Sequence, residues 1–156
     1  MIWEQELIDV AKLAGAYALA FPVGWYREKE AHSVGLRTFP VVAMASCAYV
    51  LLAAGWGHAS LDAQSRVMQG VVAGIGFVGG GAILKSEDHV HGTATAASIW
   101  NIAASGAAVA LEHYGVAVLL AGLNLMALRV LLPVKKRIDS DPELQPTSHA
   151  KPSRGD

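Results

Sequence analysis

The sequence V-M-Q-G-V-V-A-G-I-G-F-V-G-G-G-A-I-L, residues 67–84, decides the fold class of this chain. Its eighteen residues carry no charge and include six glycines. In water, each glycine inside a helix costs about 1 kcal/mol relative to alanine, whereas in lipid small residues form the surface on which helices pack. The run is therefore predicted to be a membrane-spanning helix in close contact with its neighbours. The expected packing positions are Gly70, Gly74, Gly76, Gly79, Gly80 and Gly81.

A phosphate-binding loop is the alternative interpretation of this run, because G-I-G-F-V-G at 74–79 matches the pattern G-x-G-x-x-G. That fingerprint requires a strand before it, a helix after it and an acidic residue about 20 positions further on. Here the apolar run is continuous on both sides, so a membrane helix is favoured.

The composition is also that of a membrane protein. The 156 residues are 53% hydrophobic and 16% charged, with a mean hydropathy of +0.38, whereas an average soluble protein is about 25% charged. Five spans of about 20 residues would use nearly the whole length and leave no room for a catalytic soluble domain. The formal net charge of −1 gives no basic field for nucleic acid, and the single Cys47 excludes an intrachain disulfide framework.

The apolar segments predict an all-α, polytopic membrane helix bundle of about five spans, with the glycine-rich helix third. The expected spans are residues 7–26, 39–56, 67–84, 93–111 and 114–132, with Glu112 and His113 in a tight turn before the last. Segments 27–38, 57–66 and 85–92 are expected to be loops. Pro133 is expected to end the fifth span, which divides the chain into a transmembrane domain, 1–133, and a polar, disordered cytoplasmic tail, 134–156.

The basic residues near the span ends predict an orientation, because loops rich in Lys and Arg stay in the cytoplasm. With five spans, most of these residues fall on one side of the membrane: Arg27, Lys29, Arg37, Lys85, Arg129, Lys135, Lys136 and Arg137. We therefore expect the N-terminus outside and the C-terminus in the cytoplasm.

Three motifs follow one another in the order seen in a known family. They are G-W-Y-R-E-K-E with G-L-R-T within 24–38, D-A-Q-S-R-V-M-Q-G followed by the glycine run within 62–84, and H-G-T-A-T-A-A-S-I-W at 91–100. In these motifs the chain resembles the MgtC/SapB family of bacterial inner-membrane proteins, up to about residue 132. The resemblance implies a non-enzymatic role linked to magnesium homeostasis and membrane energetics, exerted through contacts with other membrane proteins. Phe39 stands where the family usually has His, and we expect no soluble C-terminal domain of the kind many members carry.

Four residues are predicted to form a charged cluster at the cytoplasmic face: Arg27, Glu28, Arg37 and Thr38. Guanidinium groups in such a place can hold a carboxylate, a phosphate or a lipid headgroup. The alternative is that these charges only set the topology of the chain.

Further polar side chains lie within or beside the spans: Asp9, Asp62, Arg66, Asn101 and Asn124. Asp9 and Lys12, three residues apart, are expected to pair at the membrane edge, and the alternative is a place in an ion path. The two asparagines need interhelical partners, which favours a structural role over a substrate contact.

Neither an enzyme nor a closed metal site is predicted. Glu87, Asp88, His89 and His91 could bind a divalent cation weakly, but a solvated loop is favoured because no complete ligand set is visible. No Ser-His-Asp or H-E-x-x-H pattern is present, and no cofactor is expected. The competing function is a small transporter or channel for Mg²⁺ or another cation, which should bury ionisable groups near mid-membrane. The expected partners are membrane lipid, another membrane protein and further copies of the chain.

Overall fold

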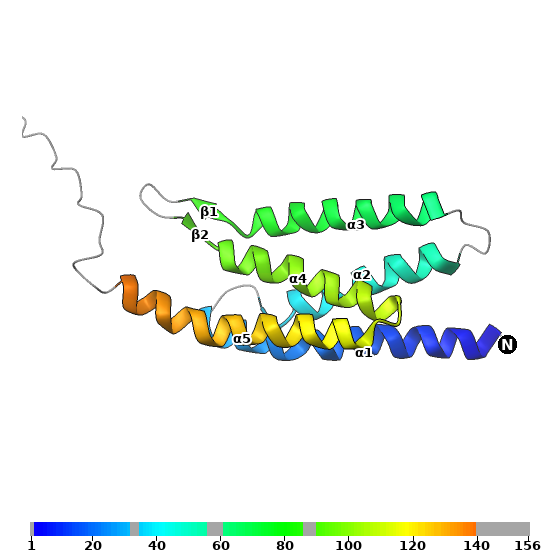
Figure 1. The fold of residues 1–156 in the computed structure, drawn as a ribbon, viewed down its shortest axis with the longest axis horizontal. Helices are drawn as coiled ribbons and strands as arrows, with labels where there is room; N and C mark the ends of the chain where they lie inside the picture. Colours follow the sequence, from blue (N-terminus) through cyan, green and yellow to red (C-terminus); the bar gives the residue numbers. More distant parts are fainter. Residues whose placement is uncertain (1, 32–34, 56–60, 86–89, 140–156) are drawn as a thin grey trace, which may run out of the picture. The chain divides into compact units, whose positions relative to one another are not determined.

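The computed structural model describes residues 2–31, 35–55, 61–85 and 90–139. These residues form five helices and one short hairpin, and the helices α1 to α4 run alternately in opposite directions (Figure 1). The all-α fold class with five helices is confirmed. The elements are α1 (Ile2–Ala31), α2 (Thr38–Gly55), α3 (Leu61–Gly81), β1 (Leu84–Lys85), β2 (Val90–His91), α4 (Thr93–Ala110) and α5 (Tyr114–Asp139).

Two of the described helices are long and apolar enough to cross a membrane, within Trp3–Lys29 and Thr38–Gly55. The apolar part of α5, Tyr114–Val130, is shorter. Glycine and polar residues dilute α3, and serine, threonine and asparagine dilute α4, which lowers the mean hydropathy of both. The five predicted helices are therefore present, whereas length and composition single out only two of them as spans.

Several predicted boundaries are wrong because the helices are longer than the apolar runs. α1 continues past Pro22 to Ala31, which places Arg27 and Glu28 on a helix instead of in a loop. α3 begins at Leu61, so that Asp62 and Arg66 are also helical. Hydrogen bonds within a helix satisfy the backbone without water, so a helix readily extends beyond the apolar segment that first defines it.

The fifth helix also continues beyond its predicted span. α5 does not end at Pro133 but runs to Asp139. Residues 126–156 group as a unit separate from residues 1–125, and the described part of this unit is the second half of α5. The rest of the predicted tail, 140–156, lies outside the described residues.

The segment between α3 and α4, expected to be a loop, contains two antiparallel strands. Leu84 pairs with His91 and Lys85 with Val90. Before the hairpin, α3 ends in a tighter turn, in which the amides of Ala82 and Ile83 donate to carbonyls three residues earlier.

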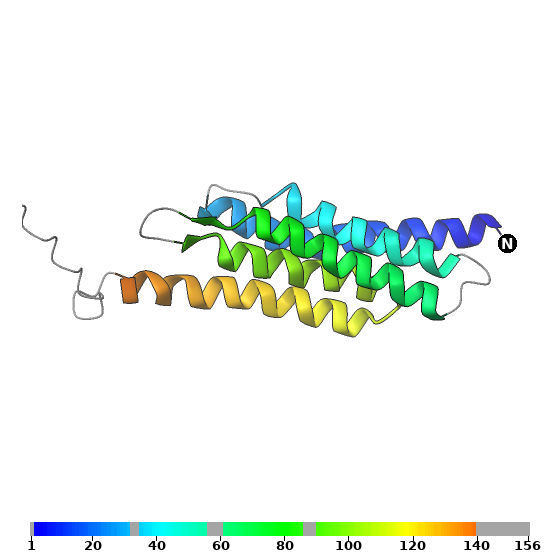
Figure 2. The same cartoon turned by 90° about the horizontal axis from the view of Figure 1, so that it is seen from above.

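α4 lies among three other helices, because it packs against α1, α2 and α3 (Figure 2). Gly106 makes the closest approach between two helices: a Cβ added there would lie 2.0 Å from the carbonyl oxygen of Ala43 in α2. Any residue with a Cβ would require the backbones of α2 and α4 to move apart here. Large buried side chains from three helices complete the core around it: Val23, Phe39, Ile99 and Ile102.

The glycine-rich α3 packs less closely than its sequence predicts. Gly79 is the one buried residue of α3, and a Cβ added there would lie 3.4 Å from the carbonyl oxygen of Ala96 in α4. A Cβ added at any of the other glycines of the run would meet no atom within 4 Å: Gly70, Gly74, Gly76, Gly80 and Gly81. Close packing at these positions therefore stays a prediction, and it concerns partners other than the described helices.

We expect Gly106→Ala to destabilise the protein, because the new methyl group would overlap the backbone of α2. Overpacking of this kind costs about 1–3 kcal/mol. The matched control is Gly122→Ala in α5, where an added Cβ meets nothing within 4 Å and alanine favours the helix. Melting temperatures in detergent should fall for Gly106→Ala and stay level or rise for Gly122→Ala. Equal melting temperatures for the two variants would contradict the close contact.

Candidate functional site

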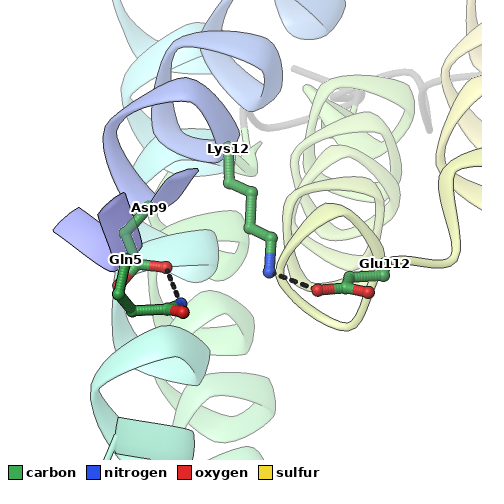
Figure 3. A network of polar contacts seen from close by, with 4 residues as sticks. All are labelled: Gln5, Asp9, Lys12 and Glu112. Carbon is green, nitrogen blue, oxygen red and sulfur yellow. Dashed lines mark hydrogen bonds and ion pairs between the residues drawn. The ribbon is translucent and has the colours of Figure 1, made fainter. Parts of the chain in front are cut away.

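An ion pair joins α1 to the turn between α4 and α5. Lys12 Nζ lies 2.8 Å from Glu112 Oε1 (Figure 3). The Lys12 side chain is 8% exposed, whereas the Glu112 side chain is 66% exposed. The Lys12 side chain is therefore buried, and its ammonium group pairs with a carboxylate that is exposed to water.

The predicted pairing of Asp9 with Lys12 is wrong. Asp9 Oδ1 accepts a hydrogen bond from Gln5 Nε2 at 3.2 Å, on the same face of α1, while Lys12 turns to Glu112 (Figure 3). Glu112 is held for this contact by its backbone, since it has a φ of 63° and its amide donates to the carbonyl of Val109. The predicted tight turn at Glu112 and His113 is confirmed.

The sequence also contains evidence for the pair between Lys12 and Glu112, although the three-residue spacing of Asp9 and Lys12 favours a different partner. Glu112 is the only acidic residue between Asp88 and Asp139. In a five-span chain the N-terminus and the fourth turn lie on the same side, so a lysine in the first helix can reach Glu112.

At the other end of α1, Arg27 turns into the bundle. Its side chain is buried, with 5% exposure, and its Nη2 donates a hydrogen bond to Oγ1 of Thr95 in the first turn of α4. Its Nε is buried without a hydrogen-bond partner. No carboxylate among the described residues forms an ion pair with Arg27. Arg27 therefore acts as a polar contact between α1 and α4, which sequence reasoning missed.

The four residues of the predicted cytoplasmic cluster make different contacts in the structure. Glu28 Oε2 accepts a hydrogen bond at 3.1 Å from the amide of Leu36 and so holds the chain that leads into α2. Arg37 is exposed beside the start of α2, and Thr38 is the first residue of that helix and half-buried. Arg27 points inward to α4, so the structure does not join the two guanidinium groups into one site.

The amides and hydroxyls inside the bundle differ in whether they find partners. Asn124 Nδ2 donates to the carbonyl of Ser98 at 3.2 Å, the interhelical contact that the sequence predicts, and Ser105 Oγ donates to the carbonyl of Ala117 at 2.8 Å. These two bonds attach α5 to α4. The Asn101 Oδ1 and Ser46 Oγ atoms are buried and have no hydrogen-bond partner in the described structure.

No group of three or more His, Cys, Asp or Glu side chains gathers among the described residues. His91 is exposed on β2, and the other residues of the predicted weak cation loop, 86–89, lie outside the described residues. Asp62 and Arg66 form an exposed pair on α3, with Oδ2 and Nε 3.5 Å apart. Such an exposed pair adds little stability.

The chain matches the model of the MgtC family over residues 13–137. Protein SrpB of Synechococcus elongatus is 38% identical over 112 residues, 64% of this chain and 59% of that protein. Protein MgtC of Brucella abortus is 36% identical over 106 residues, 68% of this chain and 44% of that protein. The Escherichia coli protein named "Putative magnesium transporter YhiD" is 30% identical over 115 residues, 69% of this chain and 53% of that protein.

The chain thus spans about half the length of these curated relatives, between 44% and 59%. No solved structure matches it.

We expect the Lys12–Glu112 pair to make stability depend on pH. The hydrogen bond from Lys12, and then its positive charge, hold the pKa of Glu112 below its ordinary value. A lowered folded pKa means that the pair stabilises the protein above the unfolded pKa of about 4.3 and that this contribution is lost as pH falls through the folded pKa. Glu112→Gln should therefore lower the melting temperature at pH 7, and the difference from the wild type should vanish in acid.

Asp62→Asn is the control, because it removes a carboxylate from an exposed pair. It should change the melting temperature little at any pH. A gap between Glu112→Gln and the wild type that does not change with pH would show that the ion pair is not responsible.

Proposed function

This chain belongs to the MgtC family, and we propose that it is a non-enzymatic protein of the bacterial inner membrane that regulates other membrane proteins. Its regulation would be linked to magnesium homeostasis and membrane energetics, as the resemblance of its motifs implies. Lys12 and Arg27 are the charged side chains buried in the described structure. Both are cations, and this is the main support for the proposal.

The two buried cations lie on the same helix, Lys12 in the first half of α1 and Arg27 near its C-terminal end. Fifteen residues of helix separate them by about 22 Å, compared with about 30 Å for the hydrocarbon core of a bilayer. A Mg²⁺ ion passing about 4 Å from Arg27, which forms no ion pair among the described residues, would meet a repulsion of roughly 8 kcal/mol at an effective dielectric constant of about 20. The charge of Lys12 is offset by Glu112. A magnesium path needs the opposite, such as carboxylates that replace part of the hydration shell.

The outward face of α3 offers a surface for another membrane protein. Gln69, Ala73, Gly76 and Gly80 are exposed and recur at three- and four-residue spacing, so they share one face of the helix. Their small size permits close approach of a second helix, with Gln69 available for a hydrogen bond. A partner helix, from another protein or from a second copy of the chain, is the proposed occupant of this face.

A magnesium transporter is the second candidate function, because that activity is in the printed name of the E. coli relative. The two candidates differ in what the isolated protein does. A transporter moves the ion by itself, whereas a regulator acts only when its partner is present.

Reconstituted protein is expected not to move Mg²⁺. Liposomes that contain a Mg²⁺-sensitive dye and the purified chain should take up Mg²⁺ no faster than liposomes that contain the dye without protein. Uptake that saturates with Mg²⁺ would favour the transporter and refute the regulator. A known magnesium channel reconstituted in the same liposomes is the positive control.

Purification in mild detergent tests the regulatory contact directly. One membrane protein should co-purify in stoichiometric amount with the wild type and be lost from Gly80→Leu, because a leucine on the outward face of α3 forces a partner helix away. Val72→Leu on the same helix is the control and should retain the partner. If the wild type and Gly80→Leu recover the same proteins, the outward face is not the contact.

We also propose that the N-terminus lies outside and the C-terminus in the cytoplasm. Single cysteines at Glu6 and Val90, both exposed positions, test this orientation in a Cys47→Ala background. An impermeant maleimide added to intact cells should label the cysteine at position 6 and not that at position 90. Labelling at position 90 alone would reverse the orientation.

A further inference from the structure

An apolar groove of about 560 Å³ lies between α2 and α3. It is lined by two rows of residues at four-residue spacing: Val41, Ala45 and Tyr49 on α2, and Gly70, Gly74 and Val78 on α3. Gly70 and Gly74 keep the groove open, since a Cβ added at either would meet no atom within 4 Å. Beside the two glycines, the groove therefore contains space that no described side chain fills.

The groove covers about half of a bilayer. Its lining on α3 extends from Val67 to Val78, which is about 16 Å of helix, compared with about 30 Å for the whole hydrocarbon core. A second transmembrane helix would pack along more of that thickness. A single acyl chain from one leaflet matches both the depth and the narrow, apolar form of the groove.

Positive charge stands at one end of the groove. Arg37 precedes Val41 by four residues, and the amide of Val41 donates to the Arg37 carbonyl, so the two share one face at the start of α2. Arg37 and Lys85 are both exposed, and Lys85 belongs to β1. β1 lies at the end of the bundle where α3 ends and α4 begins (Figure 1). Glu28, a carboxylate near this end, accepts a hydrogen bond from the amide of Leu36.

We propose that this groove binds one anionic phospholipid, with its phosphate at Arg37 and one acyl chain between α2 and α3. A guanidinium forms two parallel hydrogen bonds with a phosphate. Its positive charge favours a headgroup that carries no cation of its own, which gives the site its preference for an anionic lipid. Lys85 adds charge without that geometry. The site depends only on a membrane location and holds whether the protein regulates or transports.

Replacement of Ser46 distinguishes a lipid in the groove from a protein in the groove. It lines the groove, and its buried hydroxyl has no hydrogen-bond partner in the described structure. A hydrocarbon chain gives this hydroxyl nothing to bond, so Ser46→Ala should leave lipid binding unchanged. A partner helix with a carbonyl or amide at this depth would lose affinity in Ser46→Ala.

The test is native mass spectrometry of the delipidated full chain in detergent, titrated with phosphatidylglycerol or with phosphatidylcholine. One phosphatidylglycerol per chain should bind, at about tenfold lower concentration than phosphatidylcholine. Both lipids present a phosphate to Arg37, but the choline cation of phosphatidylcholine repels the guanidinium and offsets the phosphate charge. Arg37→Gln should abolish this preference. Gly74→Leu should remove binding of both lipids, because the leucine side chain would fill the groove.

Two control variants show whether the loss of any positive charge, or a leucine anywhere on α3, is enough to change lipid binding. Lys29→Gln removes an exposed positive charge away from the groove lining, and Gly76→Leu places a leucine on α3 at a position that does not line the groove. Both should bind phosphatidylglycerol like the wild type.

Undiminished lipid binding in Gly74→Leu would overturn the proposal, as would a headgroup preference that survives Arg37→Gln. Lipid binding that stays level while Gly74→Leu converts a dimer to a monomer would assign the groove to a second copy of the chain. If Gly74→Leu does not fold, Arg37→Gln still decides, because Arg37 is exposed and its replacement leaves the packing of the helices intact.

Discussion

The bundle depends on how closely α4 can approach its neighbours. Between helices in lipid, the surroundings are as apolar as the side chains, so attraction comes mainly from van der Waals contact and interhelical hydrogen bonds. At Gly106 the backbone of α4 lies directly against Ala43 of α2. At the start of α4, Gly92 has a φ of 88°, and a Cβ there would lie 1.9 Å from the carbonyl oxygen of Ala82. These two glycines fix where α4 begins and how deeply it lies among α1, α2 and α3.

Much of the fold follows from the sequence because apolar length and turn residues are local signals. The five helices and the turn at Glu112 could be predicted in this way. The packing could not, because a glycine shows where a close approach is allowed and not which helix makes it. The six glycines of α3 therefore predicted close packing for a helix that is mostly exposed, while Gly106 of α4 makes the tightest contact between two helices.

The candidate site shows the same division between local and distant information. Arg27, Glu28, Arg37 and Thr38 are close in sequence, and proximity alone predicts one cluster. Their surroundings separate them: Arg27 is buried against Thr95, Glu28 supports the amide of Leu36, and Arg37 remains exposed. Helical periodicity places α1 residues on different faces, but it does not show that Thr95, 68 residues away, lies opposite Arg27. The mixed roles favour a protein whose inner charges hold helices together and whose outer charges meet other molecules.

The contact between Lys12 and Glu112 spans 100 residues of chain. During synthesis the first helix enters the bilayer long before the turn after α4 exists, so the ammonium group initially has no carboxylate to meet. A lysine without a partner inside an apolar helix is costly in hydrocarbon. The ion pair that offsets this cost can form only after residue 112 has been synthesised.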